Sequence, residues 1–378
     1  MDRATGKERR PCPGFETKAK GEEFAFDLQT QSRQGQYRGE SEDVTLKDFC
    51  KSFLGARPDL QPGSVEVYKN TEQRLLNYFG KGCLLTTITP QRAEMFIANL
   101  KRLEDPDGDL SAWSRSRALR NCKTMFKMAA TWELIARNPF EKVQRPKCRV
   151  QPWHYLTPDD FMALLNASNG RQTVTLRQKA IYSLGYCCGL RKGEFVSLMW
   201  TDIDFAAATV TIQDRPATGK HPPFFVKDAE SRTVPIPQHC LAILHDLSEV
   251  NDLTDKTPFV ALDESQYKTL LSKWKRYKAE KRAWQNKDWQ NNTLDTFKLR
   301  VRWAGIEPKG TLSLHTLRKS CITNWANNIK NPETVRKLAG HADLATTMKY
   351  YSQVTPDQLQ QAAAVVDTLL SKMDVKWT

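Results

Sequence analysis

The residues best suited to chemistry in this chain are two arginines, two histidines and a tyrosine, spread over 160 positions. Arg191 ends a Gly-Leu-Arg segment, His315 and Arg318 form a His-x-x-Arg motif, and His341 follows a glycine nine residues before Tyr350. Guanidinium groups bind phosphate oxygens through paired N–H bonds, and a phenol that loses its proton can attack phosphorus. This combination predicts a site that holds a phosphodiester and breaks it through a tyrosine.

The two arginines are the predicted phosphate clamp. Attack at phosphorus adds negative charge to the non-bridging oxygens, so donors already aimed at those oxygens stabilise the transition state more than the ground state. Arg191 precedes Glu194, whose carboxylate could orient it. The alternative for each arginine is an ordinary surface ion pair, but the complete set favours Arg191 and Arg318 as the clamp.

The histidines are the predicted proton-handling groups. A phenol has a pKa near 10, so Tyr350 needs a base or a cationic site to attack at neutral pH. His315 is the better candidate for the base that accepts the tyrosine proton, and His341 for a hydrogen bond to a non-bridging oxygen. The oxygen that leaves must also gain a proton, which requires a further acid.

The ordered motifs resemble those of the tyrosine recombinases, the phage-integrase family that includes chromosome-dimer-resolving enzymes. The resemblance covers residues from about 44 to 375. It implies a covalent 3′-phosphotyrosine, a free 5′-hydroxyl, and no metal or cofactor. The family spacing selects Tyr350 over the adjacent Tyr351. It also implies a leaving-group lysine on a β-hairpin, for which Lys227 fits best and Lys220 is the alternative.

The N-terminal part is predicted to contain two segments. Residues 1–43 are polar, with few aliphatic side chains, which predicts a disordered tail. Residues 44–140 predict helices, and the resemblance implies that they form a core-DNA-binding domain of the SAM-like kind. Its expected helices include one capped by Ser64 and ended by Gly80, and one that begins with Thr89 and Pro90.

One expected helix, from Ser111 to Trp132, carries only positive charge. It has five basic residues and no acidic residue, and apolar residues at helical spacing occupy the opposite side. A solvated helix gains from mixed charges, so charge of one sign favours contact with a phosphate backbone. The candidate DNA-binding residues are Arg115, Arg117, Arg120, Lys123 and Lys127.

The C-terminal part contains the candidate site. Residues 141–154 are basic and without periodicity, which predicts a linker, and 155–378 predict an α+β catalytic domain. Val-, Thr- and Phe-rich stretches at 208–213, 224–227 and 232–236 predict a small antiparallel sheet. A last helix is expected after Thr355, packing in its own domain or on a neighbouring protomer. The fold class is therefore mainly α with a small antiparallel β-sheet.

Composition agrees with a nucleic-acid partner. The chain has 378 residues and a formal net charge of +14, which favours a polyanion, with duplex DNA first and an anionic membrane second. No apolar run approaches the length of a membrane span, and no secretory signal is visible. The nine cysteines form no C-x-x-C pair, which favours reduced thiols and a cytoplasmic, nucleoid-associated protein.

The predicted activity is site-specific cleavage and rejoining of DNA, with integration or excision of a mobile element as the expected role. The resemblance implies a tetramer that works through a four-way junction. Chromosome-dimer resolution, type IB topoisomerase activity and a catalytically inactive DNA-binding protein are the alternatives. The target sequence cannot be read from the chain, because base recognition depends on side chains placed in the grooves.

Overall fold

The chain divides into two compact units, Met1–Val150 and Gln151–Thr378. The computed structural model describes residues 17–22, 26, 44–105, 108–149, 153–226, 231–250, 257–289 and 293–351. Most of the predicted tail, the leaving-group candidate Lys227 and the predicted helix after Thr355 lie outside these residues. The fold is mainly helical, with a small antiparallel sheet in the second unit.

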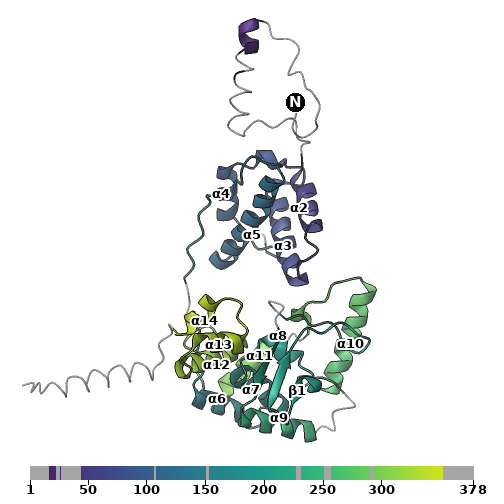
Figure 1. Cartoon of the computed structure of the whole chain (residues 1–378), viewed down its shortest axis with the longest axis vertical. Coiled ribbons are helices and arrows are strands. Elements are labelled where there is room, and N and C mark those ends of the chain that lie inside the picture. The colour runs from purple at the N-terminus through teal and green to yellow at the C-terminus, as the bar shows by residue number, and fades with distance from the viewer. Residues whose placement is uncertain are drawn as a thin grey trace, which may run out of the picture. The chain divides into compact units, whose positions relative to one another are not determined.

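The first unit is helical in the residues described (Figure 1). Its helices are α2 (Leu46–Gly55), α3 (Pro62–Phe79), α4 (Pro90–Ala98) and α5 (Ala112–Thr131), with a 3₁₀ turn at Leu85–Thr87. Their apolar faces meet in one core whose aromatic members include Phe49, Phe96, Phe126 and Phe140.

Local capping explains where these helices begin. The Thr89 hydroxyl accepts the Arg92 N–H at the start of α4, and Ser111 caps α5 at the predicted position. The prediction that Ser64 caps α3 is wrong. The helix begins two residues earlier, at Pro62, because proline suits the first helical position, where no N–H partner is needed.

The second unit combines helices with the small sheet that contains β1 (Ile203–Asp204) (Figure 1). In chain order they are α6 (Pro158–Leu165), α7 (Leu176–Cys187), α8 (Lys192–Val196), α9 (Gln238–Val250), α10 (Glu264–Ala279), α11 (Thr293–Trp303), α12 (His315–Asn328), α13 (Pro332–Ala339) and α14 (Leu344–Tyr351). Short 3₁₀ turns lie at Trp200–Asp202 and Asn286–Asp288.

The sheet differs from the predicted one in one strand. It has the antiparallel order β1 (Ile203–Asp204), β2 (Thr209–Ile212), β3 (Arg232–Pro235). The strand predicted at 224–227 is absent from the described residues 224–226, where an isolated bridge joins Arg215 to Phe224. A side chain takes the place of a strand partner here. Asn286 Oδ1 accepts the Phe225 N–H, and Asn286 Nδ2 donates to the Phe225 carbonyl.

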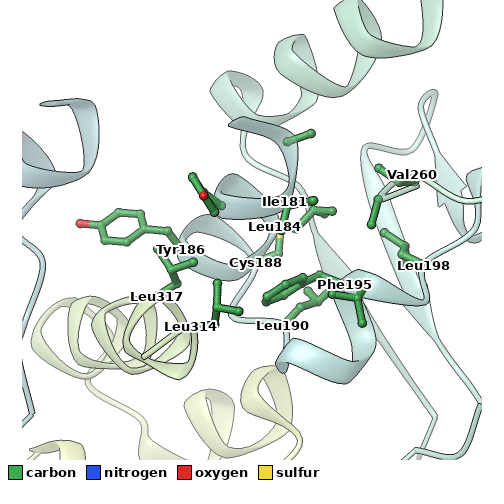
Figure 2. Packing of buried hydrophobic residues seen from close by; sticks show 14 of the residues in the cluster. Ile181, Leu184, Tyr186, Cys188, Leu190, Phe195, Leu198, Val260, Leu314 and Leu317 are labelled. Atoms are coloured by element: carbon green, nitrogen blue, oxygen red, sulfur yellow. The ribbon is translucent and has the colours of Figure 1, made fainter. Parts of the chain in front are cut away.

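The core of this unit fixes α7 against the start of α12. Figure 2 shows Leu314 and Leu317 beside Leu190 and Phe195, all within one buried cluster. A Cβ added at Gly185 on α7 would come within 3.0 Å of Leu317. This close packing holds the segment that carries Arg191 beside the helix that carries His315 and Arg318.

Candidate active site

Arg191 lies at the N-cap of α8, directly after the turn at Gly189, whose φ is +63°. Its backbone N–H donates to Glu194 Oε2 at 2.7 Å, and its Nη1 donates to Glu194 Oε1 at 3.1 Å. Its Nη2 donates to the Gly340 carbonyl at 2.6 Å, across 149 positions of sequence. The guanidinium plane is therefore fixed by its own helix and by the segment that precedes His341.

Arg318 is buried in α12, with 1% of its surface exposed. Its Nη1 donates to the Gly189 carbonyl at 2.6 Å, and its Nη2 donates to the Ala339 carbonyl at 2.5 Å. Burial, followed by the positive charge of Arg191, lowers the pKa of Arg318 to about 10, which leaves it charged at neutral pH. Both arginines thus link the Gly189–Arg191 segment to the Ala339–Gly340 segment, and the charge of Arg191 is close enough to lower the pKa of Arg318.

His341 follows Gly340, which ends α13 in the left-handed conformation with φ +60°. Its Nδ1 lies 3.0 Å from the Thr347 hydroxyl of α14. Burial, then the charges of Arg318 and Arg191, lower the pKa of His341 to about 4. The imidazole is neutral at pH 7, as a hydrogen-bond donor to a phosphate oxygen can be.

The two adjacent tyrosines of α14 have different surroundings. The Tyr350 ring stacks on His341, with centroids 5.9 Å apart and planes 21° apart. The Tyr351 hydroxyl instead donates to the Ile329 carbonyl at 2.7 Å. Burial raises the pKa of Tyr350, while Arg318 and Arg191 act against that rise. Tyr350 therefore lies beside the cationic groups as a protonated phenol, and Tyr351 has a structural bond.

His315 is the first residue of α12 and its side chain is exposed. It lies three residues before Arg318, so both side chains share one face of the helix. Its effect on the pKa of His341 places it close to that ring. The structure therefore brings together five residues that are far apart in the sequence: Arg191, His315, Arg318, His341 and Tyr350.

Of the two lysine candidates, the structure describes only Lys220. Lys227 lies outside the described residues. Lys220 is exposed beside the turn in which Thr218 N–H donates to the His221 carbonyl at 2.9 Å. The Lys220 carbonyl accepts the Tyr267 hydroxyl of α10 at 2.8 Å. The assignment of the leaving-group acid stays a prediction.

Sequence reasoning missed Arg232 and Trp153. Arg232 starts β3, and both its Nη atoms donate to Glu194, at 2.9 and 2.6 Å. The centroid of the Trp153 ring lies 5.7 Å from that of the Tyr350 ring and 4.4 Å from the Lys319 ammonium. The basic residue shortly before Val-Pro was a visible signal for Arg232, whereas Trp153 lies inside the predicted linker and had no motif to mark it.

The five basic residues of α5 fall into two groups. Arg115 donates to the Ala98 carbonyl at 3.0 Å, and Lys123 donates to the Glu141 carbonyl at 2.9 Å. These two side chains have contacts within their own unit. Arg117, Arg120 and Lys127 are exposed, so they are the better candidates for a phosphate backbone.

No group of three or more His, Cys, Asp or Glu side chains among the described residues could hold a metal ion. Within the same part of the chain, no helix is long and apolar enough to cross a membrane.

Comparisons with known proteins identify the family of both units. The model of the phage integrase family matches residues 154–357, and that of the phage integrase SAM-like domain matches 45–145. A tyrosine recombinase of Thermosipho africanus is 27% identical over 76% of this chain and 87% of its own length. The XerD recombinase of Vibrio vulnificus is 26% identical over 84% of this chain and 95% of its own length.

Solved structures share the fold. The Tn1549 transposon integrase in complex with a circular intermediate DNA has a TM-score of 0.58 at 16% identity, over 85% of this chain and 99% of that one. The lambda integrase tetramer bound to a Holliday junction has a TM-score of 0.59 at 13% identity, over 94% and 93%.

Proposed function

The chain belongs to the phage integrase family, and we propose that it acts as a site-specific recombinase through a covalent bond between Tyr350 and DNA. As a tyrosine recombinase it is an enzyme that cleaves and rejoins DNA. The observation that carries the residue assignment is the contact of Arg191 and Arg318 with the Ala339–Gly340 segment, next to the stacked pair of His341 and Tyr350.

The cleavage step begins with the phosphate between the two arginines. Arg191 and Arg318 bind its non-bridging oxygens, and a neutral His341 donates a further hydrogen bond. His315 accepts the phenol proton as the Tyr350 oxygen attacks phosphorus. The P–O bond to the 5′ oxygen breaks, and Lys227 protonates that oxygen as it leaves. The phosphotyrosyl bond keeps the energy of the broken bond, so the reverse attack by a 5′-hydroxyl reseals the strand.

The biological role we propose is integration or excision of a mobile element. Four protomers would hold two duplexes and exchange one pair of strands at a time through a four-way junction. Support comes from the fold shared with the Tn1549 and lambda integrases. The protein would work in the cytoplasm on the bacterial nucleoid, where its positive charge suits DNA.

Chromosome-dimer resolution is the second candidate role, because several curated relatives are XerC or XerD recombinases. The two roles use the same chemistry and differ in their DNA sites. Repeats in the DNA that flanks the gene distinguish them. Attachment-like direct repeats at the ends of an element support integration, whereas a single site near the replication terminus supports dimer resolution.

The test of the chemistry is covalent trapping. Nicked duplexes made from the flanking DNA lose a short fragment on cleavage, so the protein stays attached. We expect the wild type and Tyr351→Phe to form the adduct and Tyr350→Phe to form none. An adduct with Tyr350→Phe and none with Tyr351→Phe would show that the nucleophile is Tyr351.

A further inference from the structure

Arg232 contacts the site but is not one of the five assigned residues. It is the first residue of β3, and its side chain is 8% exposed. Its Nη1 donates to Glu194 Oε1 at 2.9 Å and its Nη2 donates to Glu194 Oε2 at 2.6 Å. Two parallel bonds of this kind fix both position and plane.

Glu194 is shared between two arginines. Oε1 accepts from Arg191 Nη1 and Arg232 Nη1, and Oε2 accepts from the Arg191 backbone and Arg232 Nη2. Burial alone would raise the pKa of Glu194, but the hydrogen bonds and charge of Arg232, with two further arginines, hold it below its ordinary value. Glu194 is thus a buried carboxylate whose single negative charge is shared by two arginines.

The stem of Arg232 also packs on Gly340. A Cβ added at Gly340 would lie 2.9 Å from Arg232 Cδ and 3.0 Å from its Nη1. Gly340 provides the carbonyl that holds Arg191 Nη2. Arg232 therefore touches both groups that orient Arg191, namely the Glu194 carboxylate and the Gly340 backbone.

We propose that Arg232 is a positioning residue for the phosphate clamp. It holds Glu194 and Gly340 in place, and these two residues orient the Arg191 guanidinium. This inference rests on the proposed function. Without Arg232, Arg191 would be the main partner of a buried carboxylate, and the ion pair would draw its guanidinium away from the phosphate. With Arg232 in place, two arginines share one negative charge, so positive charge is left for the substrate.

A purely structural ion pair is the alternative, and the chain offers a matched control for it. Arg215 and Asp202 form another buried pair in the same unit, with 13% and 5% of their side chains exposed. Arg215 also donates to the Ser197 carbonyl at 2.7 Å. None of these contacts involves the five assigned residues. Loss of either arginine should lower the free energy of unfolding, but only the loss of Arg232 should slow DNA cleavage.

The experiment compares Arg232→Met, Arg232→Lys and Arg215→Met in the full chain. Urea unfolding gives stability, titration gives the Kd for site DNA, and trapping at saturating DNA gives the cleavage rate. We expect Arg232→Met to cleave about 100-fold more slowly than Arg215→Met, with Kd changed less than threefold. Arg232→Lys keeps the charge but not the paired bonds, so its rate should fall about tenfold.

The outcomes separate this inference from the proposed function. Cleavage by Arg232→Met within threefold of Arg215→Met overturns the role of Arg232 while the recombinase chemistry stands. Should Arg232→Met not fold, a folded Arg232→Lys with the wild-type rate overturns it as well. Absence of any adduct with wild-type protein overturns the proposed function itself.

Discussion

Arg191 and Arg318 use part of their hydrogen-bonding capacity on backbone carbonyls. A guanidinium has five N–H donors in a fixed plane, so bonds on one side determine where the others point. Carbonyl oxygens carry only partial charge, so these bonds do not neutralise either guanidinium, and Arg191 shares the charge of the Glu194 carboxylate with Arg232. The clamp is oriented by the protein itself, which lowers the reorganisation needed when charge develops on phosphorus.

At the residue scale, His341 should make the fold sensitive to acid. The charged groups that act on it are Arg318, Arg191 and Arg232, with His315 beside them. Its pKa of about 4 lies below the ordinary value of 6.5. The unfolded chain therefore binds the proton more readily, so stability is fully present above pH 6.5 and is lost as the pH falls toward 4.

The measurement is urea unfolding at pH 7 and pH 4.5 for wild type and His341→Asn. The free energy of unfolding of the wild type should fall between pH 7 and pH 4.5. In His341→Asn the titrating ring is absent, so this fall should be smaller by roughly 2 kcal/mol. Equal losses in the two proteins would show that His341 is not held neutral by its surroundings.

The five assigned residues could be found from the sequence because chemistry restricts their types and the family fixes their order. Arg232 could not be assigned in this way. Its role depends on β3 meeting the end of α13, which spacing does not reveal. The choice between Tyr350 and Tyr351 rested on spacing, and their different contacts, a histidine ring and a backbone carbonyl, are visible only in the fold.

At the element scale, the end of α13 packs closely against β3. Gly340 has a positive φ, and a methyl group there would also push against Arg232. We expect Gly340→Ala to lower the free energy of unfolding by about 2–3 kcal/mol, from the left-handed backbone and from crowding. It should also slow cleavage, because the displaced Arg232 no longer holds Glu194.

Gly305 is the matched control for that substitution. Its φ is +69°, and nothing lies within 4 Å of an added Cβ. Gly305→Ala should therefore cost only the backbone strain, about 1 kcal/mol, and leave cleavage unchanged. Equal effects of the two substitutions on stability and on rate would contradict the crowding argument.

Helix α5 should supply part of the salt-dependent affinity for DNA. Replacing Arg120 and Lys127 with Ala should reduce the slope of log K against log salt by about 1 for each charge removed. Lys47 and Lys51 are exposed on α2 and provide a pair of equal charge as control. An equal change in slope for both pairs, measured by DNA titration at several salt concentrations, would show that α5 has no special role.

The helices were more predictable than the sheet. Thr89 and Ser111 accept backbone N–H groups at the predicted helix starts, because capping is decided by a few neighbouring residues. The segment at 224–226 has the composition of a strand, but Asp214 and Asn286 side chains bond its backbone. Partners that are distant in sequence override β propensity in such a segment.

At the scale of the whole molecule, charge and chemistry point to the same partner. The net charge of +14 is spread over a chain whose first unit carries 19 basic and 11 acidic residues between positions 44 and 150. Counterion release should therefore contribute strongly to binding. A protein that exchanges strands must also hold two duplexes together, which one protomer on one site cannot do.

Assembly can be measured with a synthetic four-way junction built from two target sites. We expect native mass measurements to give four protomers for each junction, and fewer on a single short duplex. A single protomer on every DNA, together with relaxation of supercoiled plasmid, would favour topoisomerase activity instead.

The central claim is that Tyr350 forms the covalent bond to DNA. The most direct measurement is mass spectrometry of the trapped adduct after nuclease and trypsin digestion, with fragmentation to locate the nucleotide. Trypsin can cut after Lys349, so both tyrosines fall in one peptide that fragmentation must resolve. We predict a 3′-linked nucleotide on Tyr350; a nucleotide on Tyr351, on another side chain, or linked through a 5′-phosphate would contradict the mechanism.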